Sequence, residues 1–513
     1  MNLSTFNCCN LFVLVNVMKL VIVLKLVFIG FGETTRMNVT EGLNLTTLPD
    51  GFLMGVGVSA LQTEGAWNES GKSETIWDHY THTYPEKIAD GSNVDVATDF
   101  YHKYKEDIQL VKDIGFNTFR FSISWSRIFP SGYAVDPNED GLRFYHNVLD
   151  ELKRQGITPF VTLHHFDHPQ VLEDQLNGWL NESMAYAFAD YAEFVFREYG
   201  SKVKYFTTIN EPQAFCEYFY AKTLSDVSNS GLYYLCVHNI IKAHALAYRI
   251  YDKEFRHKQN GLVGIVQASP FFYNLVDDDV NAQKIAFELH LGLVSHPIFS
   301  KTGDYPDLAK QLIDERSRVQ GLEKSKLPVF TQEWIERIQG SSDYFGLNHY
   351  TTFFVKSSPP SKMSEWNTDD GINYLYDSKS PSTQMVQMKI VPRGFRDLLN
   401  YIKNNYNDPS IFVTETGASD ANLTNDTIRM SYIYSYTKEL MRAINEDKCK
   451  VKSLIFWSLV DNFEFYGGYT IKFGLVHVDF EDKNRKRTLK ESAKWLRLGF
   501  KTQQLLPPPF FND

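Results

Sequence analysis

The sequence predicts a single (β/α)8 barrel with extended surface loops, and three observations lead to it. Short apolar runs alternate with stretches of helical periodicity, which is typical of a parallel sheet. Eight such runs can be counted along the 513 residues. Unusual polar residues follow most of the runs, where a barrel would gather them at one end. The length would suit about three average domains, but α/β barrels of this size fold as one unit.

Each predicted strand is an apolar or β-branched run. The eight runs are Gly51–Val58, Asn117–Ile123, Thr158–Leu163, Tyr205–Ile209, Leu262–Gln267, Tyr344–Asn348, Ile411–Thr414 and Ser453–Trp457. Helices are expected between them, with apolar residues three and four apart, at Tyr101–Ile114, Gly141–Arg154, Asn181–Tyr199, Tyr234–Tyr251 and Met430–Ile444. The insert Ser357–Pro392 is rich in Ser, Pro and Asp, and we expect it to form a surface loop or small subdomain of the barrel.

Composition excludes some function classes. The net charge of −10 is modest for this length, and there is no long basic tract and no Cys/His finger spacing, so nucleic acid is not an expected partner. The basic stretch Lys483–Lys490 is interpreted as a solvated loop or helix entry. An apolar content of 43% is ample for a large core, and core packing explains most of the aromatic residues.

The N-terminus is predicted to be a targeting segment. Residues 11–31 are almost wholly apolar, and Gly30–Gly32 offers small residues for cleavage, so residues 1–32 are expected to be a signal peptide. The true start is left open between Met1 and Met18. A membrane anchor is the alternative, since about 20 apolar residues can span a bilayer. Two lysines within the run favour cleavage, which would leave residues 33–513 as one domain without stable membrane association.

Three cysteines remain after this leader, at Cys216, Cys236 and Cys449. One disulfide and one free thiol is the simplest arrangement, and Cys216 with Cys236 is the favoured pair because both lie in the segment after Glu211. Three buried free cysteines are the alternative. Six glycosylation sequons also remain, and a secreted chain would carry glycans on some of them; they are Asn38, Asn44, Asn68, Asn181, Asn422 and Asn425.

Two glutamates close strand-like runs that lie far apart in the sequence. Glu211 ends the segment TTINE and Glu415 ends the segment IFVTE, and strand-breaking residues follow them, Pro212 directly and Gly417 after Thr416. In a parallel barrel both carboxylates would therefore lie at the carboxyl ends of strands and face one pocket. Cleavage of a glycosidic bond requires such a pair, one as proton donor and the other as nucleophile or base. Further polar residues lie in or after the runs at Arg120, His164, His165, Asn210, Asn348, Tyr350 and Trp457.

With these contexts the chain resembles glycoside hydrolase family 1, the β-glucosidase family. Asn210-Glu211-Pro212 is similar to the acid/base motif of that family. Thr414-Glu415-Thr416-Gly417 is similar to its nucleophile motif, with Thr416 in place of the usual Asn. Further matches bring the resemblance to nearly the whole chain, from Leu48 to Leu498; they are Phe52–Ala66, Phe119–Arg127 and Trp457–Gly474.

The resemblance implies a role for each motif residue. Glu211 would be the acid/base and Glu415 the nucleophile, which forms a glycosyl–enzyme ester. Arg120 is expected to keep Glu415 ionised and oriented, with a structural ion pair as the alternative. Tyr350 would donate a hydrogen bond to the nucleophile, and Asn210 would bind the sugar hydroxyl next to the anomeric carbon. The other expected substrate-binding residues are Gln62, His165, Trp457, Glu464, Phe465 and Phe473.

No cofactor and no metal are expected, because this mechanism needs no ion. His164, His165 and His168 form a cluster in the sequence, but no carboxylate lies at ligand spacing on a helix with them. His165 is interpreted as a neutral hydrogen-bonding group.

Five positions depart from the family pattern: Leu61, Phe166, Thr416, Phe465 and Lys472. Phe465 stands where Trp is usual, which would remove one indole N–H contact to the sugar, on the order of 0.5–1.5 kcal/mol. A Phe at this position also resembles the plant myrosinases. Those enzymes cleave S-glucosides but lack the acid/base glutamate that this chain has as Glu211. The departures therefore leave the substrate open without removing a carboxylate.

The expected function is a secreted retaining β-glucosidase that hydrolyses small O-linked β-glucosides, in a gut lumen or similar extracellular compartment. Glu64–Trp77 and His82–Tyr101 resemble insect digestive or defensive members. A thioglucosidase (myrosinase) acting on glucosinolates is the alternative, and a catalytically silent carbohydrate-binding member is the second. A homodimer is left open. A basic residue placed for a sulfate would favour the thioglucosidase, with candidates at Lys222, Arg393 and Arg396.

The group that leaves the sugar, the aglycone, is expected to lie outward of the motifs. The loops predicted to contact it are Asp167–Asn177, Ala214–Gly231 and Ser357–Pro392.

Overall fold

The computed structural model describes residues 42–221, 230–276, 279–358 and 369–508. The expected signal peptide, both candidate starts, the sequon at Asn38 and the candidate Lys222 lie outside the described residues. Parts of the Ala214–Gly231 and Ser357–Pro392 loops do so as well. Within the described ranges, no helix has both the length and the apolar character to cross a bilayer.

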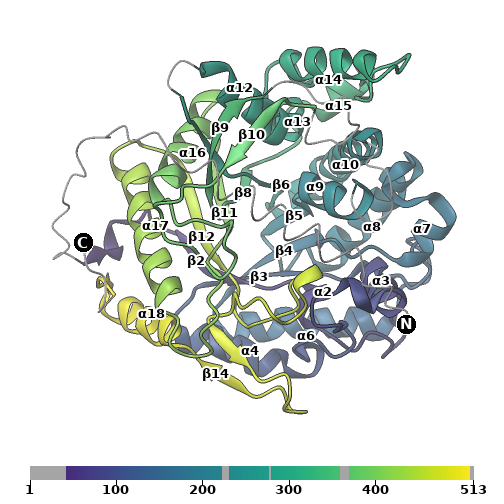
Figure 1. Cartoon of the computed structure of the whole chain (residues 1–513). Helices are drawn as coiled ribbons and strands as arrows, with labels where there is room; N and C mark the ends of the chain where they lie inside the picture. The colour runs from purple at the N-terminus through teal and green to yellow at the C-terminus, as the bar shows by residue number, and fades with distance from the viewer. Residues whose placement is uncertain (1–41, 222–229, 277–278, 359–368, 509–513) are drawn as a thin grey trace, which may run out of the picture. The chain divides into compact units, whose positions relative to one another are not determined.

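Eight parallel strands close into a barrel, seen at the centre of Figure 1, and the predicted fold class is confirmed. Each strand pairs with its neighbours in chain order, and β12 closes the ring against β2. Every predicted run is one of these strands. They are β2 (Leu53–Gly57), β3 (Thr118–Ser122), β4 (Thr158–His164), β5 (Tyr205–Asn210), β6 (Leu262–Ala268), β8 (Phe345–Asn348), β11 (Ile411–Thr416) and β12 (Val451–Trp457).

The five predicted helices all form, within a few residues of their expected ends. They are α4 (Phe100–Ile114), α6 (Glu139–Gln155), α8 (Ser183–Tyr199), α10 (Ser230–Ile250) and α17 (Thr427–Asn445). Each buries an apolar face, as the spacing of its apolar residues requires. The remaining helices are α2 (Ala60–Thr63), α3 (Ile76–Thr83), α5 (Trp125–Ile128), α7 (Gln170–Leu176), α9 (Pro212–Cys216), α11 (Arg256–Gln259), α12 (Val280–Phe287), α13 (Leu293–Phe299), α14 (Asp307–Val319), α15 (Gln332–Ile338), α16 (Pro392–Asn405) and α18 (Glu491–Thr502).

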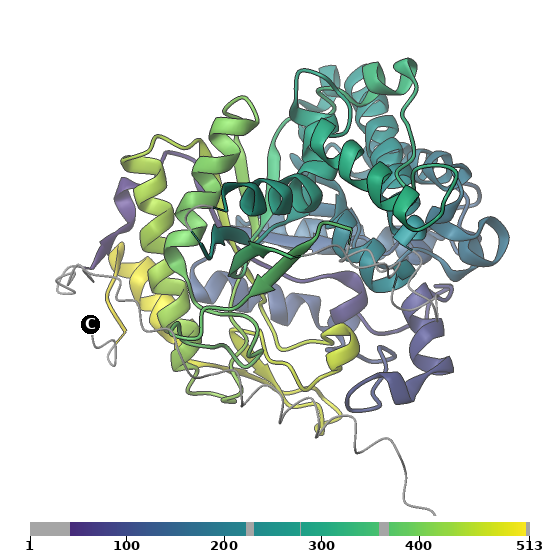
Figure 2. The same ribbon diagram turned by 45° about the horizontal axis from the view of Figure 1, so that its top comes forward.

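In the described part of the chain, three small sheets lie outside the barrel. The largest has the order β10-β9-β7, and its strands β9 and β10 are the green arrows near the centre of Figure 2. The Ser357–Pro392 insert thus begins at the end of β9 and contains β10, and it ends where α16 begins. The small-sheet strands are β1 (Leu43–Asn44), β7 (Phe271–Asn274), β9 (Thr352–Ser357), β10 (Ile372–Leu375), β13 (Val476–Val478), β14 (Arg487–Leu489) and β15 (Gln504–Leu505).

A small apolar cluster is separate from the main core, at the starts of the barrel strands. Its buried members are Leu53, Phe160, Tyr344, Phe412 and Ile455. Strict alternation along β11 would point Phe412 and Glu415 to opposite faces, because they are three residues apart. The ladder shifts register between Val413 and Glu415. Since a slip of one residue exchanges the two faces of a strand, this shift lets Phe412 and Glu415 face the same side.

The ladder between β5 and β6 shifts in the same way, between Thr207 and Asn210. Tyr205, at the start of β5, packs against the small apolar cluster. Asn210 lies five residues later, so strict alternation would point it to the opposite face. With the shift, Asn210 reaches the guanidinium of Arg120 on β3. The ladder is thus irregular just before each candidate catalytic glutamate, and bulges are common next to active sites.

Candidate active site

The carboxyl ends of the barrel strands surround a cavity of about 540 Å³. Ten of the eleven residues predicted to act in catalysis or substrate binding line it, and Arg120 lies directly behind it. The ten are Gln62, His165, Asn210, Glu211, Tyr350, Glu415, Trp457, Glu464, Phe465 and Phe473. The volume suits a small ligand such as a monosaccharide with an attached group.

Glu415 is held on both carboxylate oxygens. Arg120 donates to Oε1, and the Tyr350 hydroxyl donates to Oε2 at 2.7 Å. Only 4% of Glu415 is exposed, and Arg120 is 1% exposed. A donor on each carboxylate oxygen fixes the orientation of the Glu415 side chain beside the cavity.

The last residue of the nucleophile motif, Gly417, has to be glycine for a local reason. A Cβ added to Gly417 would lie 2.2 Å from the backbone oxygen of Trp457, far inside contact distance. The end of β11 can therefore approach the end of β12 only with glycine at this position.

Three side chains link the two glutamates. Arg120 donates to Glu415 and also, at 2.6 Å, to Asn210 Oδ1. Asn348 Nδ2 donates to the same Asn210 oxygen at 3.1 Å and to Glu211 Oε1 at 2.6 Å. Arg120, Asn210 and Asn348 are all almost fully buried. Their hydrogen bonds therefore fix the two carboxylates relative to each other.

Glu211 occupies the turn directly after β5, with a left-handed φ of 45° that is uncommon outside glycine. Burial raises the pKa of Glu211 to about 8, and the negative charge of Glu415 adds to the rise. The hydrogen bond from Asn348 and the charge of Arg120 oppose it. Near neutral pH Glu211 can thus hold a proton next to an anionic carboxylate, which is the arrangement of a general acid and a nucleophile.

The opposite part of the cavity carries the predicted sugar-binding groups. The rings of His165 and Trp457 are stacked, with centroids 5.6 Å apart, and Asn210 Nδ2 lies 3.3 Å from His165 Nε2. Gln62 Nε2 donates to Glu464 Oε2 at 3.5 Å. Burial lowers the pKa of His165 well below its usual value, and Arg120 adds to the effect, so the ring is neutral. Burial raises the pKa of Glu464 to about 8.

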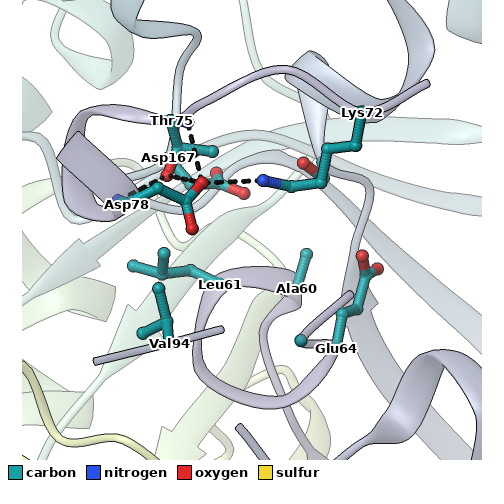
Figure 3. A pocket seen from close by; sticks show the side chains of 10 residues that line it. Ala60, Leu61, Glu64, Lys72, Thr75, Asp78, Val94 and Asp167 are labelled. Carbon is teal, nitrogen blue, oxygen red and sulfur yellow. Dashed lines mark hydrogen bonds and ion pairs between the residues drawn. The ribbon is translucent and has the colours of Figure 1, made fainter. Parts of the chain in front are cut away.

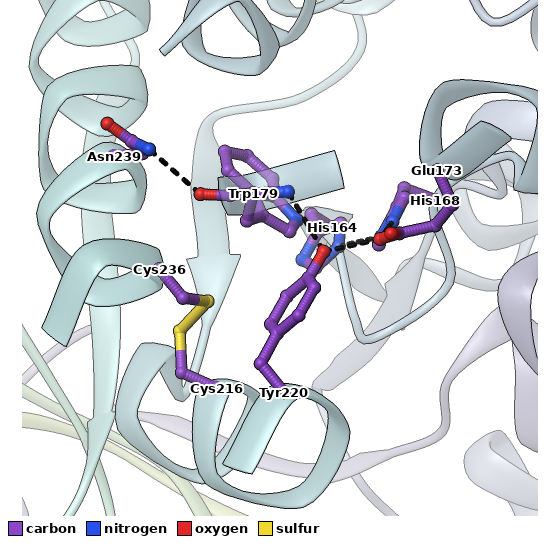
Figure 4. The surroundings of a disulfide bond; sticks show 8 residues. All are labelled: His164, His168, Glu173, Trp179, Cys216, Tyr220, Cys236 and Asn239. Atoms are coloured by element: carbon purple, nitrogen blue, oxygen red, sulfur yellow. Dashed lines mark hydrogen bonds and ion pairs between the residues drawn. A yellow bond between two sulfur atoms is a disulfide. The ribbon is translucent and has the colours of Figure 1, made fainter. Parts of the chain in front are cut away.

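The disulfide in the structure joins Cys216 to Cys236, and Cys449 is a buried free cysteine. The bond connects α9, which starts just after Glu211, to α10. Figure 4 shows the neighbouring network. His164 Nε2 lies 3.3 Å from His168 Nδ1, and His168 Nε2 lies 2.7 Å from Glu173. Tyr220 also donates to Glu173, so the segment after β4 is tied to the segment after Glu211.

The histidine cluster of the sequence is therefore divided. His164 and His168 lie in this buried network, while His165 faces the cavity. Across the described part of the chain, no group of three or more His, Cys, Asp or Glu side chains is arranged to hold a metal ion.

A second, much smaller cavity of about 10 Å³ lies behind α2 (Figure 3). Lys72 and Thr75 both contact Asp78 there, at 2.7 and 2.8 Å. Asp167 also borders it and accepts a hydrogen bond from the His165 backbone N–H at 3.2 Å. Burial raises the pKa of Asp167 to about 8. This space holds about one water molecule and cannot hold a sugar. The hydrogen bond of Asp167 instead stabilises the backbone at His165.

The sequence did not indicate the role of one residue of this site, and one of the three loops expected at the cavity does not line it. Asn348 was identified only as a polar strand end, yet it contacts Glu211 directly. Of the three loops expected to contact the aglycone, two contribute lining residues, while none of Asp167–Asn177 is among them. Arg393 is paired with Asp397, and Arg396 with Glu446 and Asp447, so neither described candidate for sulfate binding lines the cavity.

The five described sequon asparagines are all exposed: Asn44, Asn68, Asn181, Asn422 and Asn425. Two of them also stabilise turns, because Asn44 Oδ1 accepts from Thr46 N and Asn181 Oδ1 accepts from Ser183 N.

Residues 44–504 match the family model of glycosyl hydrolase family 1. Myrosinase 1 of Brevicoryne brassicae is 39% identical, over 88% of this chain and 97% of its own length. β-Glucosidase 12 of Oryza sativa subsp. japonica is 38% identical, over 88% and 92%. A solved rice β-glucosidase superposes with a TM-score of 0.82 at 37% identity, over 89% of this chain and 99% of that chain.

Proposed function

Because this chain belongs to glycosyl hydrolase family 1 and is a glycoside hydrolase, we propose that it is a retaining β-glucosidase acting on O-linked β-glucosides. The observation that carries the proposal is the pair Glu211 and Glu415, one with a raised pKa and one held by Arg120 and Tyr350. The family resemblance of both motifs supports the same assignment.

In the first step Glu415 attacks the anomeric carbon and the bond to the aglycone oxygen breaks. Glu211 gives its proton to that oxygen, so the aglycone leaves as a neutral alcohol. Arg120 and Tyr350 orient Glu415 but still leave it a carboxylate that can form an ester. Asn210 contacts the sugar hydroxyl beside the anomeric carbon, where hydrogen bonding strengthens as positive charge develops on the ring.

In the second step water replaces the aglycone. Glu211 is now ionised and removes a proton from that water, which attacks the anomeric carbon and displaces Glu415. Two displacements at one carbon restore its configuration, so the first sugar product is β-glucose. Trp457 offers an apolar ring to the sugar face, and Gln62 and Glu464 hold the hydroxyls remote from the reacting carbon.

Glu211 itself favours an O-glucosidase over the thioglucosidase. A glucosinolate aglycone leaves as a stable anion and needs little proton donation, whereas an alcohol needs a full proton. The raised pKa of Glu211 provides that proton near neutral pH. A catalytically silent binding member would not need both carboxylates in these positions.

The proposal is tested with purified protein on an aryl β-glucoside, cellobiose and a glucosinolate. NMR during the first minutes of the reaction should show β-glucose before any α-glucose forms by mutarotation. Release of α-glucose first would contradict retention. Hydrolysis of the glucosinolate alone would transfer the assignment to the thioglucosidase.

The pH dependence follows from the protonation of Glu211. Activity on an alkyl glucoside should fall as the pH rises through about 8, because the acid must be protonated in the first step. The measurement is the logarithm of kcat/KM against pH, for which a slope of minus one is expected on the alkaline side. A dinitrophenyl glucoside, whose aglycone leaves without a proton, should show a much flatter alkaline side. An equal fall for both substrates would assign the alkaline loss of activity to Glu464, which also has a raised pKa.

Glu464→Ala should lower kcat/KM by about 10²-fold, because hydrogen bonds to two sugar hydroxyls would be lost in both ground and transition states. Both kcat and KM should worsen. The loss should be equal for aryl and alkyl glucosides, since the sugar is the same in both. An unchanged kcat/KM would remove Glu464 from the sugar site.

We propose that residues 1–32 direct the chain into the secretory pathway and that it acts outside the cell. The Cys216–Cys236 disulfide and the exposed sequons support this, since disulfides and N-linked glycans are typical of secreted chains. Edman sequencing of the secreted protein would give the mature N-terminus.

A further inference from the structure

Thr416 follows the nucleophile directly and stands where the family pattern has Asn, and neither chemical step uses its side chain. It is fully buried at the end of β11 and does not line the cavity. Thr416 Oγ1 lies 2.9 Å from the hydroxyl oxygen of Tyr432 on α17, which is also fully buried. The departure from the family pattern thus joins the segment of the nucleophile to a tyrosine on a neighbouring helix.

The same Tyr432 hydroxyl contacts the segment of Tyr350. Its oxygen lies 3.1 Å from Tyr350 O and 3.3 Å from His349 O. Both of these residues contact the nucleophile, because the Tyr350 hydroxyl donates to Glu415 Oε2 at 2.7 Å and His349 N donates to Glu415 O at 3.0 Å. One buried hydroxyl therefore bridges the residue after the nucleophile and the two residues that hold the nucleophile.

We propose that Thr416 and Tyr432 are positioning residues for the nucleophile. Their hydrogen bond fixes the end of β11 against the Tyr350 segment, so that Glu415 and Tyr350 keep the geometry that attack requires. This inference rests on the proposed function and adds to it two side chains that do not touch the sugar.

The direction of these hydrogen bonds follows from the number of protons. A tyrosine hydroxyl has one hydrogen to donate, and a backbone carbonyl oxygen can only accept. Tyr432 therefore donates to a carbonyl, of which Tyr350 O is the nearer, and its own oxygen accepts from Thr416 Oγ1. Burial raises the pKa of Tyr432 well above its usual value, so the hydroxyl keeps its proton and remains a donor.

The ring of Tyr432 is held by packing along α17. It stacks on Tyr436, one helical turn further along, with centroids 3.8 Å apart. Tyr436 packs in turn against Phe395 and His349 at 5.6 and 5.9 Å. All four side chains are fully buried. The Tyr432 hydroxyl thus has a defined position between the ends of β8 and β11.

The position of Glu415 matters for the rate more than for sugar binding. Attack requires the reacting atoms to be aligned and about 3–3.5 Å apart, and a misplacement of about 1 Å can cost about 10²-fold. The proposed sugar contacts come from other side chains that line the cavity. Loss of the Thr416–Tyr432 bond should therefore slow the chemistry and leave the affinity for glucose unchanged.

The first test removes the two hydroxyls one at a time, with little change in side-chain size. Tyr432→Phe and Thr416→Val should each lower kcat/KM by about tenfold, the effect of one lost hydrogen bond. The loss should be the same on benzyl and dinitrophenyl β-glucoside, because Glu415 attacks both. The inhibition constant of glucose should stay within about twofold of the wild type. Thr416→Ser restores the hydroxyl and should restore kcat/KM to within about threefold.

The double variant Thr416→Val/Tyr432→Phe tests whether the two hydroxyls act as a pair. Either substitution alone already breaks the bond between them, so the double variant should again lose about tenfold. A loss of about a hundredfold, the product of the two single losses, would show independent effects and would overturn the pairing.

Tyr344→Phe is the matched control, because Tyr344 has the same kind of partners at the opposite end of the barrel. Its hydroxyl lies 3.0 Å from Thr207 Oγ1 and donates to Phe206 O at 2.8 Å. Tyr344 is 1% exposed and belongs to the small apolar cluster at the starts of the strands. Tyr344→Phe should lower the thermal unfolding midpoint about as much as Tyr432→Phe, while its kcat/KM stays within about twofold of the wild type.

The results separate this inference from the proposed function. If the wild type hydrolyses both glucosides and Tyr432→Phe and Thr416→Val stay within about threefold of it, the positioning role is overturned and the β-glucosidase is intact. An equal fall of kcat/KM in Tyr344→Phe would also overturn it, since loss of any buried hydroxyl would then explain the effect. A wild type without activity on either glucoside would instead overturn the proposed function.

Discussion

Replacing Glu415 with Gln is expected to reduce turnover by about 10⁴- to 10⁶-fold on every glucoside, the scale seen when an enzyme loses its nucleophile. The amide has nearly the same shape, and its oxygen can still accept a hydrogen bond from Arg120 or Tyr350. It cannot form the ester to the sugar. Steady-state rates on an aryl glucoside measure the loss, and residual activity above a few per cent would show that Glu415 is not the nucleophile.

Loss of a buried charge partner can itself destabilise a protein, so this variant needs a structural control. Asp107 provides one, because it forms a buried ion pair with Arg487 at 2.9 Å between α4 and β14, outside the cavity lining. Asp107→Asn should lower the thermal unfolding midpoint while the remaining folded enzyme keeps its kcat. A loss of kcat in Asp107→Asn comparable to that of Glu415→Gln would show that stability, and not chemistry, explains both.

Glu211→Ala is expected to lower kcat/KM for an alkyl glucoside by about 10²- to 10⁴-fold, the usual contribution of a general acid. A dinitrophenyl glucoside should lose far less in the first step, because its aglycone departs without a proton. The second step then lacks its base, so a glycosyl–enzyme should accumulate and be visible by mass spectrometry. Equal losses on both substrates would contradict the assignment of Glu211.

Azide distinguishes the two glutamates by the configuration of the product. With Glu211→Ala, azide attacks the glycosyl–enzyme without needing deprotonation, and the product should be β-glucosyl azide. With Glu415→Gly, azide would replace the missing nucleophile in a single displacement, and the product should be α-glucosyl azide. The opposite pairing of products would exchange the roles of the two residues.

The sequence predicted the barrel because each of its eight strands is a separate apolar run, and it predicted Glu211 and Glu415 because both close such runs. It did not predict α12 and α13, where a π-helical turn at Glu288–Gly292 separates the two helices. One extra residue in that turn rotates the apolar face, so the spacing of 3.6 residues is interrupted.

Other features depend on contacts that no local pattern carries. The register shifts before Asn210 and Glu415 arise from pairing with neighbouring strands, so a single strand does not indicate them. Asn348 stood out only as a polar strand end, because its partner Glu211 lies 137 residues away. The loop Asp167–Asn177 folds into α7 instead of lining the cavity, since Glu173 is drawn into the buried network with His168.

The hydrogen bonds of Asn348 decide which oxygen of Glu211 carries the proton. Thr414 Oγ1 donates to Asn348 Oδ1 at 2.7 Å, which fixes the amide with its Nδ2 toward Glu211 Oε1. An oxygen that already accepts an N–H is the poorer place for a proton, so the acidic hydrogen belongs on Oε2. Thr414 immediately precedes Glu415. Strand β11, which supplies the nucleophile, therefore also sets the direction in which Glu211 delivers its proton. Substituting Thr414 would thus disturb proton transfer to the glycosidic oxygen, although that oxygen leaves from the side of the anomeric carbon opposite Glu415.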